Sequence, residues 1–502
     1  GILATRAQAI ADHTLQAGLW DRLLQLRMSF FRRFSAGDLK TRATAVYQIR
    51  EKLGGTTLRS LLGGVASVLN LALLLYYSPK LSLIAIAIAA VNLGATTFAA
   101  VAILGRDREL VALRGSLLGL VVQLVNGVSK LRLAGAERRA FAHWAHRFAR
   151  QQRLALDVKA IQDRLAVLNG ATSFASAALL FYATADLVFQ RPAPGALAAA
   201  APLTTGAFLA FNSAFGAFLA CAASLSETVT SALEVVNLGE RAAPILEEPP
   251  EVDLAKTDPG RLRGKIALER VTFRYRGAGA PTLDEVTIRA EPGEFIAFVG
   301  ESGSGKSTIL RLLLGFETPA SGGIYFDDQD ASKLDMNAVR RQLGVVLQTG
   351  RISAGSIHDN VSGGALVTLE EVSEAARNAG LEDDIAAMPM GLHTVISEGG
   401  TNLSGGQRQR LLIARAIVLK PRILLFDEAT SALDNRTQAK VSESLDRLQA
   451  TRIVIAHRLS TIRKADRIYV LERGKVVQVG SYDELAKQEG GIFERLVARQ
   501  TA

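Results

Sequence analysis

A stretch rich in glycine and serine constrains this chain more than any other feature. It reads Gly300, Glu301, Ser302, Gly303, Ser304, Gly305, Lys306, Ser307 and Thr308. The apolar run 295–299 precedes it and the apolar helical run 309–314 follows, which is the strand–loop–helix context of a phosphate-binding loop. Glycines let the backbone curl so that successive N–H groups point at one anion, and the helix N-terminus adds donors. We expect Lys306 to face nucleotide phosphates and the Ser307 hydroxyl to bind Mg²⁺.

Composition divides the chain into two parts. Hydrophobic residues make up 49% of the 502 residues, and most of the excess lies in 60–226, whereas 250–502 has an ordinary soluble composition. The net charge is +10, but no basic patch is interleaved with aromatic residues, so we expect no nucleic-acid partner. A membrane protein with cationic cytoplasmic loops explains both properties. The single cysteine, Cys221, excludes a disulfide within the chain and suits a protein that faces the cytoplasm.

Four apolar stretches are long enough to cross a membrane as helices. They are approximately 60–79, 81–105, 165–185 and 204–226. The flanking segments are basic, because residues 1–59 hold 10 Lys or Arg against 4 acidic residues and residues 106–164 hold 12 against 5. The positive-inside rule places these segments and both chain ends in the cytoplasm. Four buried helices of a soluble domain are the alternative.

A proline pair marks the boundary between the two parts. Pro249 and Pro250 break any helix, so we expect an all-α transmembrane domain over 1–250 and an α/β domain over 251–502. In the second part, strand patterns such as 265–274 alternate with helical ones. The uncharged stretch 115–129 is short for a span, and we expect a helix packed on other helices there.

Two carboxylates end a second apolar strand in the C-terminal part. The run 423–426 precedes Asp427 and Glu428, which places both acids at the C-terminal edge of a parallel sheet, where ligands bind. We expect Asp427 to hold Mg²⁺ through water and Glu428 to polarise the attacking water. A structural pair of acids is the alternative.

A second anion-binding helix start is predicted in the same domain. Leu403, Ser404, Gly405, Gly406 and Gln407 open a helix. Two phosphate-binding helix starts are odd if one chain binds one nucleotide alone. They are explained if two copies sit head to tail, so that the loop of one copy cradles each nucleotide and the Ser-Gly-Gly helix of the other caps it.

Together these motifs resemble the nucleotide-binding domain of ATP-binding cassette (ABC) transporters, a P-loop NTPase domain. The resemblance implies an ATPase that uses ATP and Mg²⁺, with Glu428, His457 and Gln348 as catalytic residues and Ser307, Gln348 and Asp427 around the metal. Tyr275 resembles the aromatic residue that stacks on adenine. Asp434 resembles the end of the loop that crosses the dimer seam, and His457 the histidine that reads the γ-phosphate. A core aromatic and a core histidine are the alternatives for Tyr275 and His457.

Fusion of membrane helices to this domain resembles the exporters of the family. The segments 30–39, 135–138 and 397–400 resemble two cytoplasmic loops and an exporter-specific segment. Exporter halves have six spans, and this chain begins at the first cytoplasmic loop. We therefore expect an ABC exporter of type I truncated to four of six spans, in a bacterial inner or plasma membrane, with the nucleotide-binding domain in the cytoplasm.

A narrower resemblance concerns the cargo. The segments 315–319, 388–394 and 433–438 resemble the NHLM (NHLP) type bacteriocin exporters, in the subunit without a leader-peptidase domain. The expected function is an ATP-driven half-transporter for a bacteriocin-type peptide, with membrane lipid, the peptide cargo and a second half-transporter, identical or peptidase-bearing, as partners. A lipid or drug exporter, a non-transport ABC ATPase and an ATP-gated channel or regulator are the alternatives.

Overall fold

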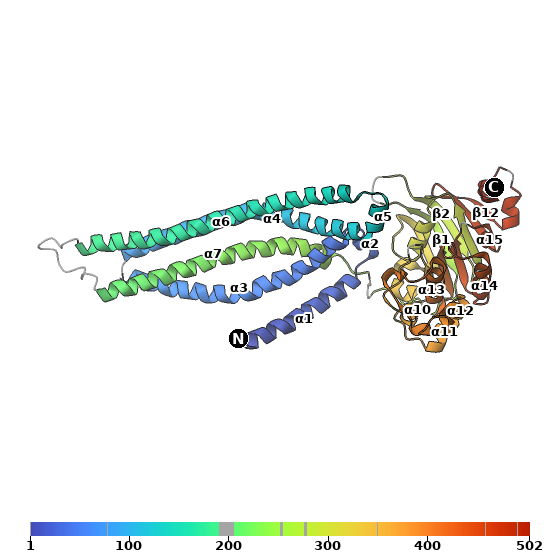
Figure 1. Ribbon diagram of the computed structural model, residues 1–502, viewed down its shortest axis with the longest axis horizontal. Helices are drawn as coiled ribbons and strands as arrows, with labels where there is room; N and C mark the ends of the chain where they lie inside the picture. Colours follow the sequence, from blue (N-terminus) through green and yellow to red (C-terminus); the bar gives the residue numbers. More distant parts are fainter. Residues whose placement is uncertain are drawn as a thin grey trace. The chain divides into compact units, whose positions relative to one another are not determined.

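The computed structural model describes residues 2–77, 79–189, 205–251, 255–275, 279–348, 350–456, 458–488 and 490–501. The chain separates into two compact units, Gly1–Pro250 and Glu251–Ala502. The first unit is helical and the second mixes strands with helices (Figure 1).

Four long helices build the first unit and lie side by side (Figure 1). They are α3 (Ala36–Tyr77), α4 (Pro79–Asn126), α6 (Glu137–Phe189) and α7 (Thr205–Glu247), joined by the shorter α1 (Ile2–Leu24), α2 (Met28–Phe31) and α5 (Val128–Leu133). Helix α7 packs on α3 and α4, and α4 also packs on α6. A core of leucine and phenylalanine, including Leu74, Leu81 and Phe211, joins α3, α4 and α7.

Each long helix is longer than the span predicted within it. The four contain 42, 48, 53 and 43 residues. At 1.5 Å per residue such helices measure roughly 60–80 Å, about twice the ~30 Å of a hydrocarbon core. The predicted spans are therefore parts of helices that continue through the charged segments. The stretch 115–129 is helical as expected, but it is the end of α4, a break at Gly127 and the start of α5 rather than a separate helix.

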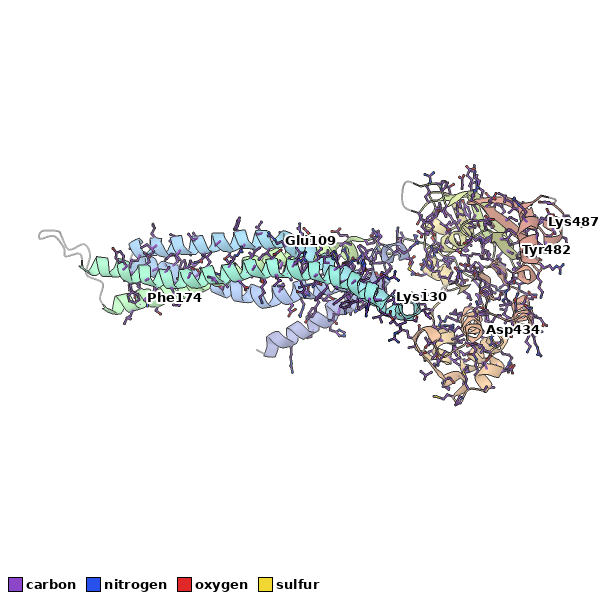
Figure 2. The ribbon with its side chains drawn as sticks, turned by 45° about the horizontal axis from the view of Figure 1, so that its top comes forward. Glu109, Lys130, Phe174, Asp434, Tyr482 and Lys487 are labelled. Carbon is purple, nitrogen blue, oxygen red and sulfur yellow. The ribbon has the colours of Figure 1, made fainter. Side chains whose placement is uncertain are left out.

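Large apolar side chains lie exposed on the surface of the first unit, and several of its buried groups are polar. Tyr76, Phe98 and Phe174 are 85%, 79% and 83% exposed, and Phe174 projects from α6 (Figure 2). Ser82 and Thr96 are buried. Within the described residues, Leu81–Asn126 is long and apolar enough to cross a membrane, and Gly63–Tyr77 and Leu209–Ala222 are shorter apolar helices. Position 204, the predicted start of the fourth span, lies outside the described residues.

Charged side chains gather near the start of α3 and the end of α7. Asp38 of α3 accepts hydrogen bonds from Arg42 Nε at 2.8 Å and from Arg241 Nη2 of α7 at 3.1 Å. Lys52 forms an ion pair with Glu234, which again joins α3 to α7. The same helices thus change from an apolar surface to a charged one along their length.

Two sheets form the second unit. The larger has the order β12-β11-β3-β10-β9-β6, and the smaller, antiparallel sheet has the order β2-β1-β4-β5. The larger sheet consists of β3 (Phe295–Gly300), β6 (Leu343–Val346), β9 (Ile423–Asp427), β10 (Thr451–Ile455), β11 (Arg467–Glu472) and β12 (Lys475–Gly480). The smaller consists of β1 (Ile266–Phe273), β2 (Leu283–Ala290), β4 (Ser321–Phe326) and β5 (Gln329–Asp330). All neighbours in the larger sheet are parallel except β11 and β12.

Helices surround the sheets and carry much of the site. Three matter most below: α8 (Lys306–Leu313), α13 (Gly405–Ile417) and α14 (Asn435–Asp446). The remaining elements are α9 (Met336–Arg340), β7 (Gly355–Ser356), α10 (Ile357–Ser362), α11 (Leu369–Asn378), α12 (Glu382–Ala386), β8 (Val395–Ile396), α15 (Leu459–Ile462), α16 (Tyr482–Ala486) and α17 (Ile492–Thr501). The strands predicted at 265–274, 295–299 and 423–426 are confirmed as β1, β3 and β9.

Candidate active site

The predicted phosphate loop joins β3 to α8, and its glycines are required by the backbone. Gly300 has φ +150°, and a Cβ there would lie 2.2 Å from the Leu471 carbonyl oxygen. Gly305 has φ +104°, and its Cβ would lie 2.6 Å from Leu283 Cδ2. Such contacts exclude any side chain, so the loop can curl only with glycine at both positions. Gly303, with φ +83°, adds a third left-handed turn.

The ammonium of Lys306 lies inside this loop. Its Nζ donates to the carbonyl oxygens of Gly300 and Glu301, each at 2.8 Å, and lies 3.4 Å from Ser304 Oγ. Burial lowers the pKa of Lys306, whereas the negative charges of Asp427 and Glu428 raise it. The net result is a lowered pKa, in which the two nearby carboxylates offset part of the effect of burial.

Sheet register explains why the carboxylates are close to the loop. Strand β10 lies between β3 and β9, and its Ile455 aligns with Phe298 on one side and with Asp427 on the other. The loop and the two acids therefore leave the sheet at the same edge, as the sequence predicted. Asp427 is buried. Glu428 has φ +53°, and its N–H donates to the Ile455 carbonyl at 3.2 Å.

Gln348 reaches the same edge from the neighbouring strand. Strand β6 runs parallel to β9 with Val346 aligned to Phe426, and Gln348 follows β6 by two residues. Its side chain is exposed. The position suits the predicted contact with Mg²⁺ and water.

Tyr275 lies beside the phosphate-loop helix. Its ring packs edge-on against Phe273 at 4.8 Å between centroids, and Arg311 Nη1 donates to its hydroxyl at 3.1 Å. The hydroxyl is 3.4 Å from Thr308 Oγ1 on the first turn of α8. The side chain is 38% exposed, which leaves part of the ring accessible to a ligand. His457, the other residue with a core alternative, lies outside the described residues.

The second predicted anion site, at the start of α13, is open on its surface. Ser404 caps the helix, because its Oγ accepts from Gln407 N at 3.1 Å while Gln407 Oε1 accepts from Ser404 N at 2.9 Å. Gln407 Nε2 also donates to Asp384 Oδ1 at 2.8 Å. Ser404 and Gly405 are exposed, and Leu403 and Gly406 are partly so.

Asp434 caps the start of α14 and ends the loop that follows Glu428 (Figure 2). Its Oδ1 accepts from the backbone of Arg436 and Thr437 at 3.0 and 2.9 Å. These hydrogen bonds, first of all those from Thr437, hold the pKa of Asp434 below its ordinary value. The carboxylate therefore stays charged and keeps the loop tied to its helix.

Sequence reasoning missed three side chains that connect these motifs. Gln409 bonds the loop after β9 from α13, Asp384 holds Gln407, and Arg458 donates to the carbonyl oxygens of Ser431 and Leu433 at 2.7 Å. The partners are far apart in sequence, so no local pattern could have identified these contacts.

The residues at the sheet edge fit ATP with Mg²⁺. The loop is too tight for side chains at two glycines, Lys306 supplies a buried positive charge, and Ser307 and Asp427 supply the hard oxygen ligands that Mg²⁺ prefers. Among the described residues no group of three His, Cys, Asp or Glu could hold a metal ion. Magnesium is usually bound by one or two carboxylates together with substrate phosphates. When bound, Mg²⁺ would neutralise charge on those phosphates.

Both units match families of known proteins. Residues 2–220 match the ABC transporter transmembrane region, and residues 283–431 match the ABC transporter family. The Toxin RTX-III translocation ATP-binding protein of Actinobacillus pleuropneumoniae is 33% identical over 485 residues, which is 96% of this chain and 67% of that protein. The cyclolysin secretion/processing ATP-binding protein of Bordetella pertussis is 34% identical over 498 residues, 97% of this chain and 68% of that protein.

A solved structure covers the whole fold. A bacterial Atm1-family ABC exporter with ATP bound superposes with a TM-score of 0.86 at 27% identity, over 100% of this chain and 87% of that one. The expected helical transmembrane domain followed by a P-loop ATPase domain is thereby confirmed. The use of ATP with Mg²⁺ and the multi-pass location in the inner membrane, with a cytoplasmic nucleotide-binding domain, are confirmed as well. The chain belongs to the ABC transporter family, as an exporter half that hydrolyses ATP to drive transport and works in a dimer.

Proposed function

We propose that hydrolysis in this exporter depends on Glu428 as the group that polarises the attacking water. The observation that carries the proposal is the shared C-terminal edge of β3 and β9, on either side of β10, where the phosphate loop and Glu428 leave the sheet within electrostatic reach of Lys306. Lys306 and the backbone of the loop would hold the β- and γ-phosphates, while Ser307, Asp427 and Gln348 would surround the metal. Tyr275 would stack on adenine, and His457 would contact the γ-phosphate.

The Glu428→Gln variant tests this assignment. Loss of the carboxylate should stop hydrolysis, whereas the phosphate loop should keep ATP bound in a closed dimer. Turnover above roughly a tenth of wild type, a barrier change below ~1.4 kcal/mol, would remove Glu428 from the catalytic role. The Glu443→Gln variant is the matched control, because Glu443 is exposed on α14.

The dimer that we propose is head to tail. The exposed start of α13, with Leu403–Gln407, would cap the nucleotide held by the phosphate loop of a second half-transporter, and Asp434 would lie at the seam. The surface exposure of Ser404 and Gly405 supports this arrangement. The second half-transporter could be an identical chain or a different, peptidase-bearing subunit, and crosslinking through a cysteine at Ser404 distinguishes the two by mass.

The four predicted spans remain a proposal for the membrane topology. They would cross the membrane within α3, α4, α6 and α7, and the basic continuations of these helices would lie in the cytoplasm. Cysteines introduced at Lys80 and Arg191, in a Cys221→Ser background, should react with an impermeant probe outside the cell. Cysteines at Arg139 and Lys265 should react only after permeabilisation. Exchange between the two groups would overturn this topology.

For the cargo, we propose a ribosomally made peptide of the bacteriocin kind. Relatives whose names describe toxin translocation and cyclolysin secretion support a peptide or protein cargo. The narrower bacteriocin assignment rests on the resemblances at 315–319, 388–394 and 433–438, all of which lie in the ATPase unit. Polar but uncharged groups between helices, such as Thr172 Oγ1 bonded to Asn92 Oδ1 at 3.1 Å, suit an amphipathic peptide and also a lipid.

Gene deletion in a producing strain tests the cargo. The mature peptide should disappear from the medium and return when the wild-type gene, but not the Glu428→Gln gene, is supplied. Undiminished secretion, or a defect confined to lipid distribution or drug resistance, would favour a lipid or drug exporter instead.

A further inference from the structure

The side chain of Gln409 connects α13 to the loop that carries Glu428. Its Nε2 donates to the Glu428 carbonyl oxygen at 3.2 Å and to Ser431 Oγ at 2.9 Å. Its Oε1 accepts from Ala432 N at 2.7 Å. The amide nitrogen and the amide oxygen of Gln409 therefore both bond to a segment that lies 19 to 23 residues away in sequence.

Arg458 holds the same segment from elsewhere in the unit. Its Nη2 donates to the Ser431 carbonyl, and its Nη1 donates to the Leu433 carbonyl and to Gln438 Oε1, at 2.7 to 2.8 Å. The residues 428–433 thus bond to two side chains, one from α13 and one from the segment just before α15. The segment forms no helix or strand of its own, and these contacts add to its backbone turns, in which Ser431 N donates to the Glu428 carbonyl at 3.1 Å and Leu433 N to the Thr430 carbonyl at 3.2 Å.

Glu428 needs such support because its backbone is strained. Its φ of +53° lies in the left-handed region, which costs a residue with a side chain on the order of 1–3 kcal/mol. A strained conformation persists only when surrounding contacts determine it. The hydrogen bond from Gln409 to the Glu428 carbonyl is one such contact, and it acts on the peptide group that sets the direction of the following chain.

We propose that Gln409 is a positioning residue for ATP hydrolysis, which orients Glu428 through the backbone. This inference rests on the catalytic role proposed above for Glu428. Gln409 lies two residues after Gln407, at the helix start that faces the opposite nucleotide in the proposed dimer. Displacement of that helix start when it caps a nucleotide is therefore transmitted by Gln409 to the glutamate of the same chain's own site.

Two substitutions of the purified full chain in lipid nanodiscs test the proposal. Gln409→Met keeps the length of the side chain and removes all three hydrogen bonds, so kcat should fall about tenfold or more, equivalent to ~1.4 kcal/mol. KM and the affinity for ATP should stay within about twofold, because the phosphate loop is untouched. Gln409→Glu keeps the acceptor for Ala432 N and should lie between Gln409→Met and wild type. The Gln488→Met variant, with the same change at an exposed glutamine, should match wild type.

The distinguishing measurement is a double-mutant cycle with Glu428→Gln. If Gln409 acts through Glu428, adding Gln409→Met to Glu428→Gln should leave the residual turnover unchanged. Three results would each overturn the positioning role. They are an unchanged kcat in Gln409→Met, a further loss of turnover when Gln409→Met is added to Glu428→Gln, and a loss in Gln409→Met that affects only ATP affinity and thermal stability. Failure of Glu428→Gln itself to reduce turnover would instead contradict the catalytic assignment on which the cycle depends.

Discussion

The starts of α8 and α13 are both rich in glycine, but the first is enclosed by the fold and the second is exposed. The start of α8 is enclosed: Gly305 has no room for a Cβ, Lys306 is buried, and no side chain caps the helix. The start of α13 is exposed: Ser404 caps the helix itself, and a Cβ at Gly405 would have its nearest contact at 3.8 Å. The first start is therefore built within one chain, whereas the second leaves its surface open, as the head-to-tail dimer proposed above requires.

Removing the charge at the enclosed start should give the largest effect. In Lys306→Ala, loss of the ammonium should weaken ATP binding at least about tenfold, ~1.4 kcal/mol, and reduce turnover by more than about 100-fold, ~2.7 kcal/mol. A nucleotide titration and an ATPase assay measure both. Lys487→Ala, at an exposed lysine (Figure 2), is the control and should leave both unchanged. Unaltered affinity in Lys306→Ala would contradict the phosphate-loop assignment.

Adding a charge at the exposed start should separate binding from turnover. Gly405→Asp meets no steric obstacle within the chain, so the fold and the ATP affinity of the isolated chain should stay as in wild type. The new carboxylate would face the phosphates bound by the other half, so kcat should fall about 100-fold, ~2.7 kcal/mol. Gly405→Ala is the uncharged control and should lose much less. Equal losses in the two variants would attribute the effect to shape rather than to charge.

Mixing the two defective chains sharpens the contrast. A dimer of one Lys306→Ala chain and one Gly405→Asp chain combines both defects in one site and leaves the other site intact. ATPase activity should therefore reappear in a coexpressed mixture although each variant alone is inactive. A chain that carries both substitutions should show no recovery, because every site in its homodimer contains both defects. A mixture as inactive as its parts would contradict a homodimer with shared sites.

The smallest effect should come from the contacts that support the exposed start. Asp384 accepts from Gln407 Nε2 and pairs with Arg410 Nη1 at 2.7 Å, in a half-buried position. Asp384→Ala should lower kcat about twofold to fivefold and the free energy of unfolding by about 1 kcal/mol, the range of partly exposed ion pairs. The control is Asp383→Ala at the exposed neighbouring residue, which should change neither kcat nor the free energy of unfolding. A stability loss without any loss of kcat would limit Asp384 to holding the fold.

Sequence patterns predicted the local parts of this molecule and missed the distant contacts. The phosphate loop, β3 and the acids after β9 are encoded in runs of consecutive residues, because strand, turn and helix each have a local signature. Hydropathy located apolar stretches in α3, α4 and α7 but not the helix ends, since α4 continues past Arg106 and Arg108 where the apolar run stops. The contacts of Gln409, Arg458 and Asp384 depend on how the chain folds back on itself, which no single sequence reveals.

The left-handed backbone of Glu428 has a consequence for how such proteins change over generations. Glycine adopts a φ of +53° without penalty, so Glu428→Gly would relieve strain at the same position where it removes the acid. The catalytic role proposed above for Glu428 would therefore set selection for activity against selection for a stable fold at this residue. In a lineage whose partner subunit had taken over all turnover, activity would no longer oppose the replacement of this glutamate by glycine, and that replacement would remove the backbone strain.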